Sequence, residues 1–359
     1  MLKKFTVSNY KNFKDEISLD FSKIGEYSFN VDCLSIRLIY GRNATGKTNF
    51  GRALLDIKIL LYGMQSSGLI NEDGAAKFKY EFKFGNDEVV YKYSRFSNTE
   101  LCDEELYING EAIFKCDFKN SKFDFQGLSI ISAETVNTNR YLNKDEMDNE
   151  YVLPFLRWLI NNTAFSDDSV LIQLSKYVRK MCMITVGNDL LYSNRNFLEN
   201  LKNPVYLHNF EDFLNLMGIE CKLVLQELPD GQVELYFAHK KLVPFYSTAS
   251  SGTLALTSLY QKIVSNLSLI YLDDFAAFYH YEIAEKLISF IKNKYPECQF
   301  IMTSHNTNLM TNKIMRPDCL FILSSKGTLT ALCDATEREL REGHNLEKMY
   351  ISGEFEKCE

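Results

Sequence analysis

The chain has 359 residues, of which 46% are hydrophobic and 24% are charged, and this composition excludes a disordered or fibrous protein. The length allows two domains, or one α/β domain with an insertion. With 40 Lys and Arg residues against 47 Asp and Glu, the formal net charge of -7 argues against a basic coat for nucleic acid, while a local basic patch stays open.

The cysteines and the apolar stretches concern the compartment. The nine cysteines are odd in number and scattered, and no CxxC pair or Cys/His cluster has zinc spacing, which favours reduced thiols in a cytoplasm. The first residues carry charges without an apolar run behind them, unlike a secretory signal. The longest apolar stretches, such as 54–62 and 267–272, are far shorter than the ~20 residues that span a bilayer. We therefore expect a cytoplasmic protein with no membrane partner.

The N-terminal third predicts strands around one helix. Residues 34–40 form a mostly apolar run that predicts a buried central strand. Apolar residues then recur at helical spacing over 48–63, so a helix should follow the loop at 41–47. Alternation with period two next predicts antiparallel hairpins, and a further short strand is expected at 128–132.

The rest of the chain changes from helices to alternating elements. Residues 140–215 carry mixed charge and amphipathic stretches at 151–161 and 170–183, which predict a helical insertion. After one more hairpin, helices alternate with strands, which predicts parallel pairing in a doubly wound sheet. The elements expected in this last part are 253–265, 267–272, 281–295, 299–303 and 319–323.

A glycine-rich loop follows the buried strand. The run Gly41-Arg42-Asn43-Ala44-Thr45-Gly46-Lys47-Thr48 fits GxxxxGK[ST] between a strand and a helix, the context that distinguishes a P-loop from a chance turn. Its backbone N–H groups and the helix N-terminus would face phosphate. Lys47 would neutralise the β- and γ-phosphates, and the Thr48 hydroxyl would bind Mg²⁺. Asn49 completes the expected nucleotide-binding run.

A pair of carboxylates follows another apolar strand. A P-loop that hydrolyses its nucleotide needs an acidic residue at the end of a second strand. The run at 267–272 ends in Asp273 and Asp274, which is the Walker B arrangement. Asp273 would hold Mg²⁺, and Asp274 would orient or deprotonate the attacking water. A helix N-cap is the alternative for such a pair.

Two further segments place polar groups near expected sheet and helix ends. Ser250, Ser251 and Gly252 precede a helix and would make a second anion site, although a plain Ser/Thr cap also explains them. His305 follows the strand expected at 299–303, and at the C-terminal edge of a sheet it could reach a γ-phosphate. The alternative for a lone histidine is a structural role.

The order of these four segments resembles the ABC-type ATPases, in the branch that contains the SMC-like and OLD-like proteins. The resemblance implies an α/β fold, an ABC-type P-loop ATPase head with an antiparallel β subdomain, here with a helical insertion. It also implies a signature at 249–253, a switch histidine at His305, and two ATP molecules held between two heads. Ser250 and Gly252 would then act in trans across an ATP-sandwiched homodimer or a higher oligomer.

The chain departs from that family at three positions. The family usually has Glu where this chain has Asp274, and the shorter side chain would slow hydrolysis. Ser251 and Thr253 stand where the signature usually has Gly and Gln. For the glutamine of the Q-loop, Gln126 lies near the expected strand.

Both ends of the chain should build one head, because Lys47 and Asp273 must serve one Mg-nucleotide. The expected parts are the P-loop and β subdomain at 1–139, the insertion at 140–215, the signature, Walker B and switch histidine at 216–335, and a tail at 336–359.

The ends of the chain, at 5–13 and 350–355, also look like those of small AAA-annotated ATPases encoded in phage-defence operons. The resemblance implies an enzyme that binds ATP and Mg²⁺, hydrolyses ATP, and serves as the sensor or regulatory subunit beside a separate effector such as a nuclease. One alternative is a nucleotide-gated scaffold with little hydrolysis. Another is a DNA-repair ATPase that contacts DNA directly, which the net charge of -7 disfavours.

Overall fold

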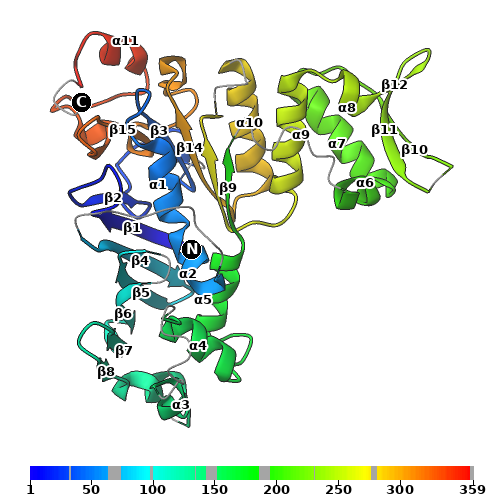
Figure 1. Ribbon diagram of the computed structural model, residues 1–359. Helices are drawn as coiled ribbons and strands as arrows, with labels where there is room; N and C mark the ends of the chain where they lie inside the picture. Colours follow the sequence, from blue (N-terminus) through cyan, green and yellow to red (C-terminus); the bar gives the residue numbers. More distant parts are fainter. Residues whose placement is uncertain are drawn as a thin grey trace.

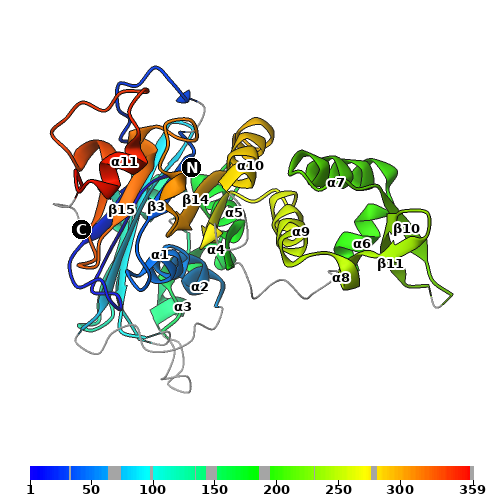
Figure 2. The same ribbon diagram turned by 90° about the horizontal axis from the view of Figure 1, so that it is seen from above.

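The computed structural model describes residues 1–31, 34–63, 74–97, 100–133, 135–142, 152–185, 195–229, 231–275 and 281–355. Their strands form a six-stranded, a seven-stranded and a three-stranded sheet. Figures 1 and 2 show the two large sheets in one body and the small sheet in a lobe at its side. Among these residues, we find no helix with the length and apolar character that a bilayer crossing requires.

The six-stranded sheet lies at the centre of the fold. In spatial order, its strands are β16 (Leu329–Ala331), β15 (Leu320–Leu323), β3 (Ile36–Tyr40), β14 (Gln299–Ser304), β13 (Leu269–Asp273) and β9 (Met181–Thr185). All neighbours run parallel except the edge pair β15 and β16. Every residue of β3, β13, β14 and β15 is buried, as expected for strands covered on both faces. The expected α/β class with a parallel sheet is confirmed.

Alternate side chains of this sheet enter two different cores. One face, which includes Tyr271, packs against α1 (Lys47–Leu54) and the seven-stranded sheet. The other face, which includes Leu272, packs against α9 (Ser251–Ile263) and α10 (Tyr281–Lys294). Full burial of each large apolar side chain stabilises the fold by about 1.5–3 kcal/mol, so the sheet position is strongly fixed.

The seven-stranded sheet is antiparallel throughout, and it is the expected β subdomain. In spatial order, its strands are β2 (Ile17–Asp20), β1 (Leu2–Ser8), β4 (Ala76–Phe84), β5 (Asp87–Arg95), β6 (Leu101–Ile108), β7 (Glu111–Asp117) and β8 (Lys122–Asp124). The period-two pattern places Phe5, Tyr80 and Tyr91 on its buried face.

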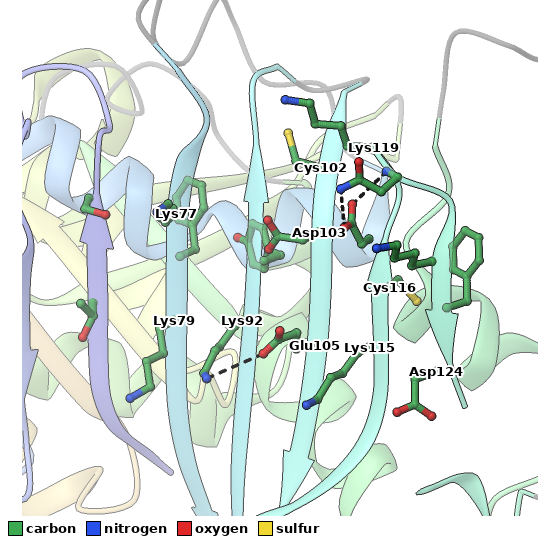
Figure 3. Close-up of a pocket in the computed structure, with 18 of the residues that line it drawn as sticks. Lys77, Lys79, Lys92, Cys102, Asp103, Glu105, Lys115, Cys116, Lys119 and Asp124 are labelled. Atoms are coloured by element: carbon green, nitrogen blue, oxygen red, sulfur yellow. Dashed lines mark hydrogen bonds and ion pairs between the residues drawn. The ribbon is translucent and has the colours of Figure 1, made fainter. Parts of the chain in front are cut away.

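The other face of this sheet is an open polar surface (Figure 3). The pairing register places Lys79, Lys92, Glu105 and Lys115 in one row across the strands. Lys92 Nζ lies 3.7 Å from Glu105 Oε2. Lysines and carboxylates are therefore mixed on this face, rather than forming a region of one charge.

The small lobe packs against α9 and α10. Its elements are α6 (Arg195–Leu201), α7 (Pro204–Leu216), β10 (Leu223–Glu227), β11 (Val233–Ala238), β12 (Leu242–Pro244) and α8 (Phe245–Thr248). Phe213 of α7 joins the lobe to both supporting helices, because its ring centroid lies 4.8 Å from that of Tyr260 and 5.0 Å from that of Phe290.

The remaining helices and short segments cover the two sheets. The α-helices are α2 (Asp56–Tyr62), α3 (Thr138–Leu142), α4 (Phe155–Asn162), α5 (Val170–Arg179) and α11 (Leu346–Ile351). The 3-10 helices are η2 (Gln126–Ile131), η5 (Thr307–Leu309), η6 (Pro317–Cys319) and η7 (Leu332–Asp334). The C-terminal α11 contacts the central sheet, since the Tyr350 ring centroid lies 4.9 Å from that of Tyr40.

Two sequence expectations differ from these elements. The helix expected at 48–63 is two helices, because the chain turns at Leu55 and the buried Asp56 at the start of α2 is paired with Arg95. The strand expected at 128–132 is wrong. Leu128 is buried there while Ser129 and Ile130 are both exposed, so η2 has no alternating face to add to a sheet.

The stretch expected as a helical insertion also contains a strand. Within 140–215, β9 pairs in parallel with β13 and so belongs to the central sheet. Its five residues follow α5 directly, and the apolar pattern of 170–183 does not mark where the helix ends. Residues 143–151 and 186–194 of this stretch lie outside the described residues. The expected domain boundaries at 139, 215 and 335 stay a prediction.

A fully buried carboxylate joins the seven-stranded sheet to α4. The oxygens of Glu104 accept hydrogen bonds from Phe155 N at 2.6 Å and Leu156 N at 3.0 Å, the first N–H groups of the helix. Tyr91 Oη donates a third hydrogen bond at 2.8 Å. Burial raises the pKa of Glu104 to about 7, against the lowering effect of these three donors.

This raised pKa predicts a pH-dependent stability. Because the pKa of Glu104 in the folded chain exceeds its ordinary value of 4.5, its contribution is complete below about pH 4.5 and is lost as the pH rises through about 7. Across that range, the free energy of unfolding of the wild type should fall by roughly 3 kcal/mol relative to Glu104→Gln. Urea unfolding of both proteins over this pH range measures the difference. Parallel pH profiles would contradict the prediction.

Candidate active site

The P-loop begins where β3 ends. Gly41 N donates to Ser304 O at 3.1 Å, so the loop starts while still paired to the end of β14. Gly46 immediately precedes α1 with a φ of 107°, a left-handed conformation that favours glycine. A Cβ at Gly46 would also lie 2.3 Å from Asn12 Nδ2, so a side chain there would displace the Asn12 amide. Arg42, Asn43 and Ala44 are exposed at its tip.

Lys47 lies along the inside of this loop. It is 8% exposed, and its ammonium donates to Gly41 O at 2.6 Å and to Arg42 O at 2.9 Å. Burial lowers the pKa of Lys47, while Asp274 and Asp273 act in the opposite direction. An anionic ligand would replace the two carbonyl oxygens with a stronger, charge-assisted partner.

The carboxylate of Asp273 joins the P-loop to the ends of two further strands. Thr48 Oγ1 donates to Asp273 Oδ2 at 2.6 Å, and Thr303 Oγ1 donates to Asp273 Oδ1 at 3.0 Å. Asp273 is 3% exposed, so both oxygens are held in fixed directions. The three residues come from α1, β13 and β14, and they meet because the carboxyl ends of parallel strands share one edge.

Asp274 and His305 form a second pair at the same edge. His305 Nδ1 lies 2.9 Å from Asp274 Oδ1, and the two side chains are 44% and 42% exposed. Asp274 has a φ of 50°, which is uncommon for a residue with a Cβ. Its N–H donates to Thr303 Oγ1 at 2.8 Å, which helps to hold the turn. This pair is therefore positioned, yet open to solvent and to a ligand.

The residues at this edge fit Mg²⁺ and nucleotide phosphate. Thr48 and Asp273 offer a hydroxyl and a carboxylate oxygen, the hard ligands that Mg²⁺ prefers when phosphates and waters complete its shell. The ammonium of Lys47 and the N-terminus of α1 supply positive charge for phosphate.

The expected signature lies apart from this edge. Ser250, Ser251 and Gly252 are at the start of α9, which the two ribbon views show beside α8 and away from α1 (Figures 1 and 2). Ser250 Oγ accepts from Thr253 N at 3.2 Å, so it caps its own helix. Ser250 and Ser251 are exposed to solvent. Within one chain, the structure does not bring them to the P-loop.

Gln126 also lies outside the site. It begins η2 after β8, the outermost strand of the seven-stranded sheet, and it is exposed there. The assignment of a Q-loop glutamine to Gln126 therefore has no support from its position.

Three residues at the site were missed by sequence reasoning. Asn12 anchors the P-loop, since Asn12 Nδ2 donates to Thr45 O at 3.1 Å and Asn12 Oδ1 accepts from Asn49 Nδ2 at 2.7 Å. Tyr271 Oη donates to Lys47 O at 2.6 Å. Thr303 contacts the carboxylate of Asp273 and the backbone N–H of Asp274. The sequence held a signal for Thr303, because it is a polar residue inside an apolar strand. Nothing in the local sequence pattern indicated Asn12.

The fold and the site together are those of a P-loop ATPase. A P-loop follows one parallel strand, and the Walker B carboxylates follow the next strand but one in the same sheet. Residues 130–311, half of the chain, match the family described as "AAA domain, putative AbiEii toxin, Type IV TA system". The chain belongs to this family. The match includes Asp273, Asp274 and His305 and begins after the P-loop.

Several solved structures are similar to the chain at low sequence identity. An SMC head bound to the C-winged helix domain of ScpA is 14% identical with a TM-score of 0.46, over 89% of this chain and 93% of that chain. The SMC head domain from Thermotoga maritima is 14% identical with a TM-score of 0.46, over 92% and 98%. An Smc head from Pyrococcus furiosus, bound to the C-terminal domain of ScpA, is 13% identical with a TM-score of 0.47, over 92% and 95%. The curated proteins gave no significant match.

The anchoring of the P-loop by Asn12 predicts a loss of nucleotide affinity in Asn12→Ala. The variant loses two hydrogen bonds that hold Thr45 and Asn49, each worth about 1 kcal/mol, so ATP should bind about 5- to 30-fold more weakly. Titration with a fluorescent ATP analogue measures the change. Asn120→Ala is the control, because its amide bonds Asp117 in the seven-stranded sheet. Equal affinity of Asn12→Ala and the wild type would refute the anchoring role.

Proposed function

We propose that the chain binds ATP with Mg²⁺ at this edge and hydrolyses it to ADP and phosphate. The observation that carries the proposal is the 2.6 Å hydrogen bond between Thr48 and Asp273, which lie 225 positions apart in the chain. A chance P-loop match would have no reason to meet a Walker B carboxylate at this distance. Asp274 and His305 complete the set on the solvent side.

Each residue has a role that follows from its place. Lys47 binds the β- and γ-phosphates after leaving the loop carbonyls, and Thr48 and Asp273 hold Mg²⁺, which neutralises phosphate charge when bound. Asp274 orients the attacking water and accepts its proton. His305 holds Asp274 through Nδ1 and contacts the γ-phosphate. The backbone N–H groups of 41–46 orient the phosphates.

The activity is tested first by removing the two charges. Lys47→Ala and Asp274→Asn should each lower kcat by about 100-fold or more, because one loses phosphate neutralisation and the other loses the proton acceptor. Lys92→Ala and Asp117→Asn, on the open face of the seven-stranded sheet, are the matched controls. Steady-state phosphate release measures all four. Undiminished turnover in Lys47→Ala would place the activity elsewhere.

We further propose that the active form is an ATP-sandwiched homodimer, to which Ser250 and Gly252 contribute in trans. The support is the position of these residues at the start of α9, where Ser250 is exposed, remote from the P-loop of their own chain. A helix N-terminus with a free face can meet the phosphates of a second chain.

A mixing experiment separates trans from cis action. Lys47→Ala and Ser250→Ala should each be inactive alone, but a mixed dimer has one site with an intact P-loop and an intact signature. If chains pair at random, an equal mixture should recover about a quarter of wild-type turnover. Phosphate release before and after mixing gives the answer. A mixture that stays as inactive as its components contradicts the trans arrangement.

A nucleotide-gated scaffold with little hydrolysis is the second candidate. It is favoured by Asp274, which has a shorter side chain than Glu and is already bonded to His305. This candidate predicts ATP binding without turnover in the wild type. The same phosphate-release assay, together with ATP titration, therefore decides between the two.

The biological role that we propose is that of a cytoplasmic sensor or regulator in a phage-defence system, acting with a separate effector such as a nuclease. Support comes from the family description, which names a toxin of a toxin-antitoxin system, and from the similarity of the chain ends to defence ATPases. Direct DNA contact is less favoured, because Glu105 and Asp124 interrupt the lysines of the open face (Figure 3). Purification of the full chain with and without ATP tests for the effector.

A further inference from the structure

One buried hydroxyl contacts both Walker B aspartates, one through its carboxylate and the other through its backbone N–H. Thr303 lies in β14, where every residue is buried, and it is 0% exposed. Its Oγ1 lies 3.0 Å from Asp273 Oδ1 and 2.8 Å from Asp274 N. A hydroxyl has one proton, and the N–H of Asp274 can only donate. The proton of Thr303 therefore goes to Asp273, and its lone pair accepts from Asp274.

The first of these hydrogen bonds gives the two oxygens of Asp273 different partners. Oδ1 accepts from Thr303, which leaves Oδ2 for Thr48 at 2.6 Å. Without the Thr303 hydroxyl, Oδ1 would be buried without this partner, and only the hydrogen bond from Thr48 would hold the carboxylate in place. Thr303 thus fixes the orientation of the carboxylate, with one oxygen toward Thr303 and the other toward Thr48.

The second hydrogen bond holds the turned backbone of Asp274. A φ of 50° costs of order 1 kcal/mol for a residue with a Cβ, so it needs support from its surroundings. The bond from Asp274 N to Thr303 fixes the turn that directs the Asp274 carboxylate toward His305 at 2.9 Å. One side chain thereby aligns the metal-side carboxylate and the water-side carboxylate with each other.

We propose that Thr303 is the positioning residue of the site, and that its hydroxyl, rather than its bulk, sets the geometry of both Asp273 and Asp274. The proposal rests on the ATPase function proposed above. Thr303 touches neither phosphate nor water in this scheme. It acts through the two aspartates, on which Mg²⁺ binding and proton transfer depend.

The test compares variants that separate the hydroxyl from the packing. Thr303→Val keeps the shape and loses the hydroxyl, whereas Thr303→Ser keeps the hydroxyl and loses a methyl group. Loss of a supporting hydrogen bond to a metal ligand typically costs about 10- to 100-fold. Thr303→Val should lower kcat by about this factor and raise the Mg²⁺ concentration for half-maximal rate, whereas Thr303→Ser should stay within about threefold of the wild type.

A matched control removes the same kind of contact elsewhere. Ser94 is buried in β5 and donates its hydroxyl to Asp103, far from the P-loop in the seven-stranded sheet. Ser94→Ala should leave kcat and the Mg²⁺ dependence unchanged. Thermal unfolding of each variant checks folding, and if Thr303→Val does not fold, Thr303→Ala gives the second variant without a hydroxyl.

Each outcome of this experiment either supports or overturns the positioning role of Thr303. Wild-type kinetics in Thr303→Val, or a defect of the same size in Thr303→Ser, would overturn the proposal, because the hydroxyl would then be unimportant. If the wild type binds ATP but does not hydrolyse it, the proposed activity fails separately, and the readout becomes the gain in ATP affinity on adding Mg²⁺. The positioning role stands if Thr303→Val loses that gain while Thr303→Ser keeps it, and falls if all three proteins show it equally.

Discussion

The site depends on one strand, β14, lying in parallel between β3 and β13. Residues at the end of this strand and just after it contact three partners. Thr303 contacts the two aspartates after β13, the carbonyl of Ser304 accepts from Gly41 of the P-loop, and His305 pairs with Asp274. Since the P-loop strand and the Walker B strand are not neighbours, β14 sets the distance between them. A shift of β14 by one residue would separate all these contacts at once.

The electrostatics of the edge follow from this arrangement. One ammonium and two carboxylates lie close together, and burial lowers the pKa of Lys47 while Asp274 and Asp273 counteract the shift. The carboxylate nearest the P-loop is buried and hydrogen-bonded on both oxygens, whereas Asp274 and His305 are open to solvent. This division matches the two tasks of a Walker B pair, in which one carboxylate holds a cation and the other handles water. The positive charge that faces a phosphate at this edge comes from Lys47 and the N-terminus of α1, so an anion site here needs few cationic groups even in an acidic chain.

The sequence was sufficient where the chemistry is local. The P-loop, the parallel strands and the residues Asp273, Asp274 and His305 all carry patterns within a few positions, and the structure brings them to one edge. It was insufficient where a contact joins distant segments. Asn12 looks like an ordinary turn residue until it meets Thr45, and β9 resembles the end of a helix until it pairs with β13. These features are set by tertiary packing, which overrides local propensity.

The order of the strands along the chain has a consequence for folding during synthesis. The strands of the seven-stranded sheet all lie within the first 124 residues and pair largely through hairpins, so this sheet can assemble early. By contrast, β3 pairs with β14 and β15, which leave the ribosome only after residues 299 and 320. Until then, the apolar strand β3 lacks its neighbours in the central sheet, and it is open to aggregation and to binding by chaperones. Nucleotide could therefore stabilise the chain only late in synthesis, when the C-terminal strands close over the loop that binds it.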